Sequence, residues 1–184
     1  MTDLAIDSSG PWLSLAVRRG ELRAERAVHL GRAHSVQLPA RVGELYRELG
    51  LPFWADRVIL GSGPGSYTGL RVAQAYALGL ASAWGGTALL GVSSLAGMVP
   101  LDRAGRWLVA TDAGRGRFYS AAYAVGSGHL TCLAAEAKRE EGELRQLEAE
   151  LGLQLAQATF PSGLALLELA ELGLGRAPPQ LQYL

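Results

Sequence analysis

A glycine-rich loop is the clearest chemical signal in the chain. It reads GPGSYTGLR over residues 63–71 and lies between an apolar run and a long helical pattern, as many phosphate-binding loops do. A Walker loop is excluded because its glycine spacing and its Lys are both missing. The dinucleotide pattern G-x-G-x-x-G is excluded as well, since the two G-x-G pairs lead to Ser66 and Thr68 instead of a third glycine.

Two interpretations of this loop remain. Ser66 or Thr68 precedes a helix N-terminus, whose free amides and positive dipole end can hold an anion. Alternatively, Thr68 is the N-cap of that helix, and the glycines only permit a tight crossing from strand to helix. We favour the mechanical interpretation and keep weak anion or nucleotide binding as the alternative.

Two acidic residues stand where predicted strands end, Asp7 in AIDSSG and Asp112 in ATDAGRG. An acid at a strand end before a turn of small residues can position a metal-bound phosphate. The simpler interpretation is that each aspartate initiates a turn. If the first interpretation held, the chain would be an autonomous nucleotide-binding ATPase or phosphotransferase that uses Asp7 and Asp112.

The sequence offers few residues for metal binding or nucleophilic catalysis. The histidines, His29, His34 and His129, are too dispersed to form a metal-binding pair on one helix. His129 and Cys132 are three apart on a predicted strand, so their side chains point to opposite faces. No serine lies in a G-x-S-x-G pattern, and Cys132 has no evident base. We therefore expect no catalytic residue and no metal.

Composition limits the classes of function. The 184 residues carry 17 Lys and Arg against 17 Asp and Glu, scattered along the chain, which disfavours direct binding of nucleic acid. The single cysteine, Cys132, forms no intrachain disulfide, and the acidic start MTDLAIDSSG is unlike a signal peptide. These features predict a cytoplasmic protein.

One long stretch without charge, residues 72–101, needs a separate interpretation. Its length is compatible with a membrane span. However, Gln74, the Gly85–Gly86 pair and the Ser93–Ser94 pair divide it into pieces too short to cross a bilayer. We expect a buried helix, a strand and a short helix, and no membrane residence.

The elements that must position these residues follow from hydrophobic periodicity. The first thirty residues predict a three-stranded antiparallel meander. Residues 35–49 predict an amphipathic helix with Pro39 near its start. Further strands are expected at 57–63, 87–92, 106–113, 117–125 and 129–137, and further helices at 69–84, from 94, at 139–152 and at 162–175. This order predicts an α/β fold, a mixed sheet with helices on its faces.

The helix at residues 69–84 is unusual because it is apolar on nearly every side and rich in Ala and Gly. Such a helix is normally covered on more than one side. Its cover is either the rest of this chain or a second protein, since small residues allow another helix to approach closely.

Taken together and in order, several segments resemble a known family. LAIDSS, WLSLAV, HSVQLPARVGELYRELGL, GSGPGSYTGLRVAQAYALGLA, LLGVSSLAGM and ATDAGRGRFYSAAY are similar to the TsaB (YeaZ) family. The resemblance implies an actin-like ATPase (ASKHA, ribonuclease H-like) fold, with an N-terminal lobe at residues 1–101 and a smaller, trimmed C-terminal lobe at residues 102–184.

The resemblance also implies a role in the N6-threonylcarbamoyladenosine (t6A) modification of A37 in tRNA. The family is the non-catalytic paralogue that binds the transferase TsaD, with TsaE as the associated ATPase. Ser94 and Met98 stand where TsaD-type proteins carry an H-x-x-x-H metal pair, and a hydroxyl with a thioether is a poor iron or zinc site. We therefore expect an inactive scaffold subunit without a cofactor of its own, and at most weak ATP or ADP binding at a complex interface.

The family's partner surface is formed by the two N-terminal helices, and it serves both the TsaD heterodimer and a homodimer of the free protein. Applied to this chain, the resemblance implies an interface on the helices at 35–49 and 69–84. It also implies that tRNA is contacted only through the complex. The candidate interface residues are Leu38, Val42, Leu45, Tyr46, Leu49, Leu70, Ala73, Ala77, Leu80 and Ala81.

Overall fold

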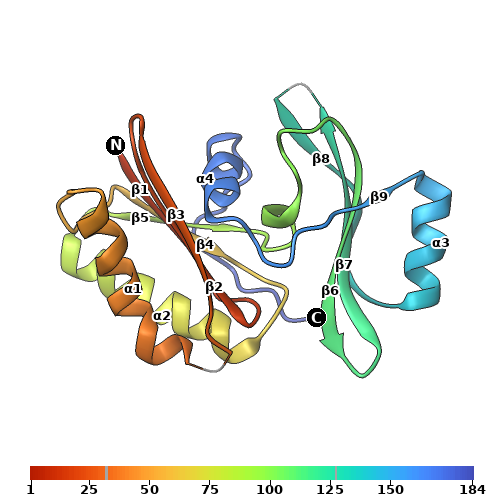
Figure 1. Cartoon of the computed structure of the whole chain (residues 1–184), viewed down its shortest axis with the longest axis horizontal. Coiled ribbons are helices and arrows are strands. Elements are labelled where there is room, and N and C mark those ends of the chain that lie inside the picture. Colours follow the sequence, from red (N-terminus) through yellow and green to blue (C-terminus); the bar gives the residue numbers. More distant parts are fainter. Residues whose placement is uncertain (32, 127) are drawn as a thin grey trace.

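The computed structural model describes residues 1–31, 33–126 and 128–184, which form two β-sheets with four α-helices around them (Figure 1). The first sheet has the order β3-β2-β1-β4-β5 and the second has the order β8-β7-β6-β9. The strands are β1 (Thr2–Asp7), β2 (Trp12–Arg19), β3 (Leu22–His29), β4 (Arg57–Gly61), β5 (Ala88–Val92), β6 (Gly105–Gly114), β7 (Arg117–Gly126), β8 (His129–Glu140) and β9 (Gln154–Leu155). The helices are α1 (His34–Glu48), α2 (Tyr67–Trp84), α3 (Glu141–Leu151), α4 (Gly163–Glu171) and the 3₁₀ helix η1 (Ala96–Met98).

The first sheet begins with the predicted meander, in which β1, β2 and β3 pair antiparallel. β4 and β5 then join in parallel through the crossover helices α1 and α2. Alternate side chains of β1 serve two cores, because successive residues of a strand point to opposite faces. Leu4 and Ile6 pack under α1 and α2, whereas Ala5 faces the core shared with α4 and the second sheet.

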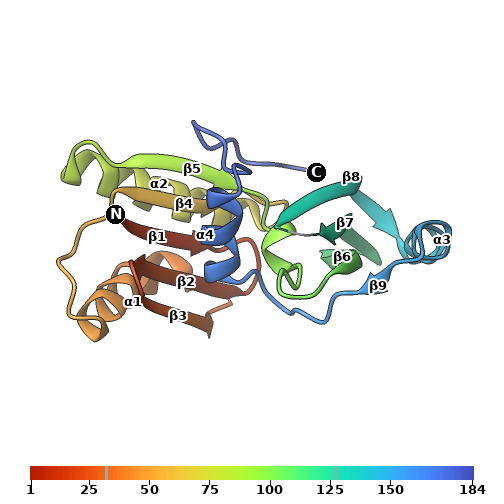
Figure 2. The ribbon, with the colours of Figure 1, turned by 90° about the horizontal axis from the view of Figure 1, so that it is seen from above.

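Helix α4 returns from the end of the chain to cover the face of the first sheet opposite α1 and α2 (Figure 2). It lies close to the strands, since a Cβ at Gly163 would be 2.8 Å from the backbone nitrogen of Ala16. The expected unit at residues 102–184 is therefore divided in space: its strands form the second sheet, but α4 belongs to the packing of the first.

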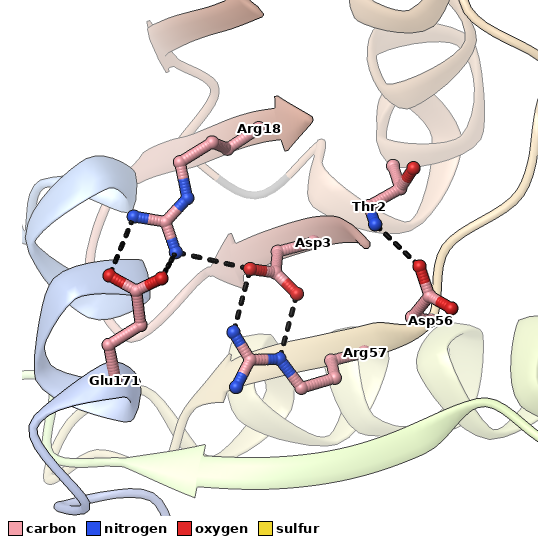
Figure 3. Close-up of polar contacts among 6 residues, drawn as sticks. All are labelled: Thr2, Asp3, Arg18, Asp56, Arg57 and Glu171. Carbon is pink, nitrogen blue, oxygen red and sulfur yellow. Dashed lines mark hydrogen bonds and ion pairs between the residues drawn. The ribbon is translucent and has the colours of Figure 1, made fainter. Parts of the chain in front are cut away.

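A polar network links α4 to three strands of the first sheet (Figure 3). Asp3 on β1 accepts hydrogen bonds from Arg57 on β4, at 2.7 and 2.8 Å, and from Arg18 on β2 at 3.1 Å. Arg18 also pairs with Glu171 of α4 at 2.7 Å. Burial disfavours the charged form of Asp3, but its bonds to Arg57 and Arg18 outweigh this and lower its pKa.

The second sheet is antiparallel except for the short parallel pair of β6 with β9. One of its faces meets η1 and α4, and α3 covers the other (Figure 1). Helix α3 begins with a reciprocal capping box of Glu140 and Glu143 and ends at Gly152 in the left-handed conformation. The mixed sheet with helices on its faces is thus confirmed in the first sheet, and the later strands form a second sheet with a junction between the two.

Several expected boundaries were wrong for local reasons. Helix α2 begins at Tyr67, and its N-cap is Ser66, not Thr68, because the Ser66 hydroxyl accepts the amide of Gly69. Pro39 lies inside α1 instead of at its start, since the helix already begins at His34. The two-residue strand β9 was not predicted. In the described part of the chain, no helix is long and apolar enough to cross a membrane.

Candidate functional site

A cavity of about 620 Å³ lies at the junction of the two sheets, and we call it the inter-sheet cleft. Its walls come from the turn after β1, the start of α2, the loop after β5, the tip of the β6–β7 hairpin and the segment before α4. The carboxyl ends of β1, β4 and β5 open toward it, which is where open α/β sheets bind ligands. Its polar lining residues are Ser9, Ser66, Tyr67, Ser94, Thr111, Asp112, Tyr119 and Thr159.

Asp7 lies beneath this cleft and does not reach it. The residue is completely buried, and both of its carboxylate oxygens are already occupied. The amide and hydroxyl of Ser9 donate to Oδ1 at 2.8 and 2.7 Å, and the hydroxyl of Ser94 donates to Oδ2 at 2.5 Å. Burial raises the pKa of Asp7, against the opposing effect of these hydrogen bonds. Asp7 therefore positions the loops around it and is not free to hold a metal-bound phosphate.

The glycine-rich loop is built for close backbone approach. Just before the loop, at the end of β4, a Cβ at Gly61 would be 1.7 Å from the carboxylate of Asp7. Within the loop, one at Gly65 would be 2.2 Å from the carbonyl oxygen of Ser9. A Cβ at Gly69 would be 2.0 Å from the carbonyl oxygen of Ser8. No real side chain fits at these distances. The structure thus favours the mechanical interpretation, in which these glycines let the loop pack against the turn after β1.

The other predicted anion-binding residues are not brought together. Ser66 lines the cleft, but its hydroxyl is occupied as the N-cap of α2. Thr68 is exposed and does not line the cleft. Asp112 is exposed at the rim, where its carboxylate accepts the amide of Gly114 at 2.7 Å, as expected of an aspartate that stabilises a turn. Asp7 and Asp112 therefore do not form a paired acidic site.

The charge of the cleft also disfavours a polyphosphate. Among the described residues that line it, none is Lys, Arg or His, and Asp112 is the one carboxylate. Among these described residues a triphosphate would find the dipole of α2 but no basic side chain, whereas phosphate sites usually combine the two.

Ser94 and Met98 occupy the two positions singled out as metal-pair equivalents. Both are buried, at 1% and 5% exposure, and both line the cleft. The hydroxyl of Ser94 donates to Asp7 and accepts the amide of Gly63 at 3.0 Å, so it is committed to the loop scaffold. Across the described residues, no group of three or more His, Cys, Asp or Glu side chains is placed to hold a metal ion.

The residues predicted at a partner interface need a correction. They form the apolar stripes of α1 and α2, and these stripes face the first sheet instead of solvent. Leu49 and Ala81 are half-buried. The core takes the most apolar face of each helix, so a partner must use the other face. The corrected residues, which are at most 8% exposed, are Leu38, Val42, Leu45, Tyr46, Leu70, Ala73, Ala77 and Leu80.

The α1–α2 outer face is the surface that these two helices turn to solvent. It combines small residues with isolated large apolar ones, and Val36 and Leu78 are 80% and 53% exposed. Gly43 and Gly79 on these helices have open space where a Cβ would be. Helical spacing alone could have found this face as the complement of the buried stripes. Its exposed members include Ser35, Val36, Pro39, Ala40, Arg47, Arg71, Ala75, Leu78, Gly79, Ser82 and Ala83.

Comparison with known proteins relates this architecture to a family. A family model described as TsaD, tRNA N6-adenosine threonylcarbamoyltransferase, matches residues 28–177. The tRNA threonylcarbamoyladenosine biosynthesis protein TsaB of Bacillus subtilis is 33% identical over 135 residues, which cover 71% of this chain and 58% of that protein. An uncharacterised Mycobacterium bovis protein is 36% identical over 129 residues, which cover 68% and 60% of the two chains. The chain thus spans about three fifths of the length of these curated relatives.

A solved structure supports the same relation over the whole chain. YeaZ from Pseudomonas aeruginosa superimposes with a TM-score of 0.82 at 25% identity, covering 100% of this chain and 99% of that one. The paired sheets and the cleft at their junction thus define an α/β protein of the actin-like ASKHA class. Within that class, the chain belongs to the TsaB/YeaZ family.

Proposed function

We propose that this protein is a non-catalytic scaffold subunit in the t6A modification of tRNA. It binds a TsaD-type catalytic subunit, together with a TsaE-type ATPase, and supports threonylcarbamoyl transfer to A37. Membership of the TsaB/YeaZ family and the name of the Bacillus subtilis relative support the pathway. The balanced charge supports tRNA contact through the complex and not by this chain alone.

The burial and hydrogen bonding of Ser94 are the main support for a non-catalytic role. Ser94 stands where the resemblance to TsaD-type proteins places one histidine of their metal pair. In this chain the side chain is buried and hydrogen-bonded to Asp7 and to the amide of Gly63. Both acids of the alternative ATPase hypothesis are also committed, Asp7 to buried hydrogen bonds and Asp112 to a turn. These contacts leave the cleft with one carboxylate, the turn-forming Asp112, and with no basic side chain and no metal ligand set among the residues described.

The α1–α2 outer face is the proposed partner surface. Its small residues allow a partner helix to approach closely, and Val36 and Leu78 can insert into a complementary surface. The same face would form the homodimer of the free protein, so partner and second copy compete for it.

A co-purification experiment tests this assignment. The tagged chain is mixed with the TsaD-type subunit of its own organism, with TsaE and nucleotide present, and the retained TsaD is measured. We expect stable retention by the wild type and a loss of about tenfold or more in Leu78→Arg, because a charge replaces an apolar contact at the centre of the face. If the wild type retains no TsaD under these conditions, the proposal fails.

Leu155→Arg is the matched control, because Leu155 is 49% exposed on β9, remote from the α1–α2 outer face. It should retain TsaD as the wild type does. Equal loss in both variants would mean that Leu78 reports general damage and not an interface. The molecular mass in solution shows whether the free protein is a homodimer. Leu78→Arg should convert this homodimer to a monomer, and Leu155→Arg should not.

A further inference from the structure

A second cavity of about 530 Å³ lies on the other side of the loop after β5. Ser93 lines this cavity, whereas its neighbour Ser94 lines the inter-sheet cleft. The walls are the ends of β4 and β5, the strands β7 and β8, and the C-terminal segment from Leu174 to Gln182. We call it the C-terminal cavity.

The C-terminal segment is held in place at both ends of this cavity. The backbone of Arg176 pairs with Gly91 of β5 through two hydrogen bonds of 2.8 and 3.0 Å. The amide of Gln182 donates to the carbonyl oxygen of Ser62 at 2.8 Å. The side chains that line this wall therefore extend from an ordered backbone.

An acidic group lines the cavity without a cation to balance it. The carboxylate of Glu136 accepts hydrogen bonds from the hydroxyls of Ser93 and Tyr123. It makes no ion pair among the residues that the structure describes. Burial raises the pKa of Glu136 against the effect of these two bonds, as expected of a carboxylate that has lost water and gained no positive partner.

A basic group lines the same cavity and also lacks a charged partner among the described residues. Arg176 is exposed and, within the described chain, its guanidinium makes no hydrogen bond or ion pair. It also lies beyond ion-pair distance of Glu136, since these two residues form no salt bridge. Arginine in this state is available to bind a carboxylate in bidentate fashion.

The remaining lining suits a ligand with N–H donors and an apolar part. The side-chain oxygen of Gln182, Oε1, is buried and has no donor among the described residues. A buried acceptor without a donor is costly unless a ligand or water supplies one. The aliphatic lining residues are Val92, Ala96, Leu130, Ala135, Leu174 and Leu181.

We propose that the C-terminal cavity binds a zwitterionic α-amino acid with an apolar side chain. Arg176 binds the α-carboxylate, Glu136 and the Gln182 oxygen bind the α-ammonium group, and the apolar lining contacts the side chain. A ligand with both charges balances the two unpaired groups at once, whereas an anion or a cation would balance one and leave the other unpaired. This site is separate from the inter-sheet cleft and from the proposed partner face.

Calorimetric titration of the full chain tests the proposal with three apolar amino acids, L-leucine, L-methionine and L-phenylalanine. Leucinamide lacks the carboxylate and N-acetyl-leucine lacks the ammonium group. For whichever amino acid binds, we expect the corresponding amide and N-acetyl derivative each to bind at least about tenfold more weakly. No saturable binding of any of the three amino acids up to about 10 mM would overturn the proposal.

Two variants assign the charges. Arg176→Gln should weaken the amino acid about tenfold and remove its advantage over the amide, while Glu136→Gln should remove its advantage over the N-acetyl derivative. The Arg176 side chain makes no hydrogen bond or ion pair within the described chain, so its variant should fold, and circular dichroism verifies this for both. Arg23→Gln, an exposed arginine on β3, is the matched control and should bind as the wild type does. Binding that is unchanged in both Arg176→Gln and Glu136→Gln would place the ligand elsewhere and overturn the assignment.

Discussion

The two cavities on either side of residues 93–94 differ in how their polar groups are satisfied. Below the inter-sheet cleft, Ser9 and Ser94 both bond to Asp7, and Ser94 also bonds to the glycine-rich loop. Among the described residues, no basic side chain lines the space above them. In the C-terminal cavity, Glu136 and Arg176 have opposite charges and no charged partner among the residues described. A cavity at the strand ends therefore does not by itself predict a ligand. What can bind depends on which polar groups of the lining still lack a hydrogen-bond or ion-pair partner.

The largest expected effect tests how tightly the floor of the cleft is packed. Gly69→Ala should destabilise the protein by about 3 kcal/mol, because the new methyl group would overlap the carbonyl oxygen of Ser8. Chemical denaturation measures the free energy of unfolding. Gly79→Ala, in the same helix but with open space at its Cβ, should instead stabilise by about 0.5–1 kcal/mol. Similar effects of the two substitutions would mean that the loop does not need its glycine for close approach.

A buried acid with cationic partners provides the contrast with Glu136. Asp3→Asn should cost about 2 kcal/mol at neutral pH, because Arg57 and Arg18 lose a buried carboxylate, although both arginine side chains are about one fifth exposed. Since the pKa of Asp3 is lowered by folding, its contribution is present above the unfolded pKa and is lost as the pH falls through the folded one. Denaturation at several pH values should show the cost of Asp3→Asn shrinking in acid, and a constant cost would contradict the ion-pair explanation.

The contribution of Asp7 to stability should depend on pH in the opposite direction from that of Asp3. Its pKa is raised by folding, so its contribution is present below the unfolded pKa, near 4, and is lost as the pH rises through the folded value. Asp7→Asn keeps an acceptor for Ser9 and removes the charge, so it should be more stabilising at pH 8 than at pH 4. Thermal unfolding across this range measures the difference. A variant that is less stabilising at pH 8 than at pH 4 would contradict the raised pKa of Asp7.

The smallest expected effect concerns the start of α2. Ser66→Ala should cost about 1 kcal/mol because it removes the N-cap hydroxyl, whereas Thr68→Ala should change stability by less than about 0.5 kcal/mol. Denaturation of the two variants compares the sites directly. If Thr68 proved the costlier position, the helix would begin two residues later, as the sequence pattern predicts.

Much of the fold could be predicted because it depends on local pattern. Alternation identified the meander and the β6–β7 hairpin, and helical spacing identified α1, α2, α3 and α4 within a few residues. The excluded phosphate-loop patterns followed from spacing alone. The family was indicated by the resemblance of several segments in order, and comparison confirmed it. These features are encoded by neighbours in the chain, so the sequence by itself determined them.

The candidate sites depended on contacts between distant residues, which only the tertiary structure decided. Asp7 and Asp112 both follow a strand pattern, but burial under Ser94 separates the first from the cleft, and a turn occupies the second. The stripes of α1 and α2 were correctly found, yet the core and not a partner covers them. Glu136 and Arg176 lie forty residues apart with no motif between them, so their shared cavity appears only once β8 and the C-terminal segment pack beside β5.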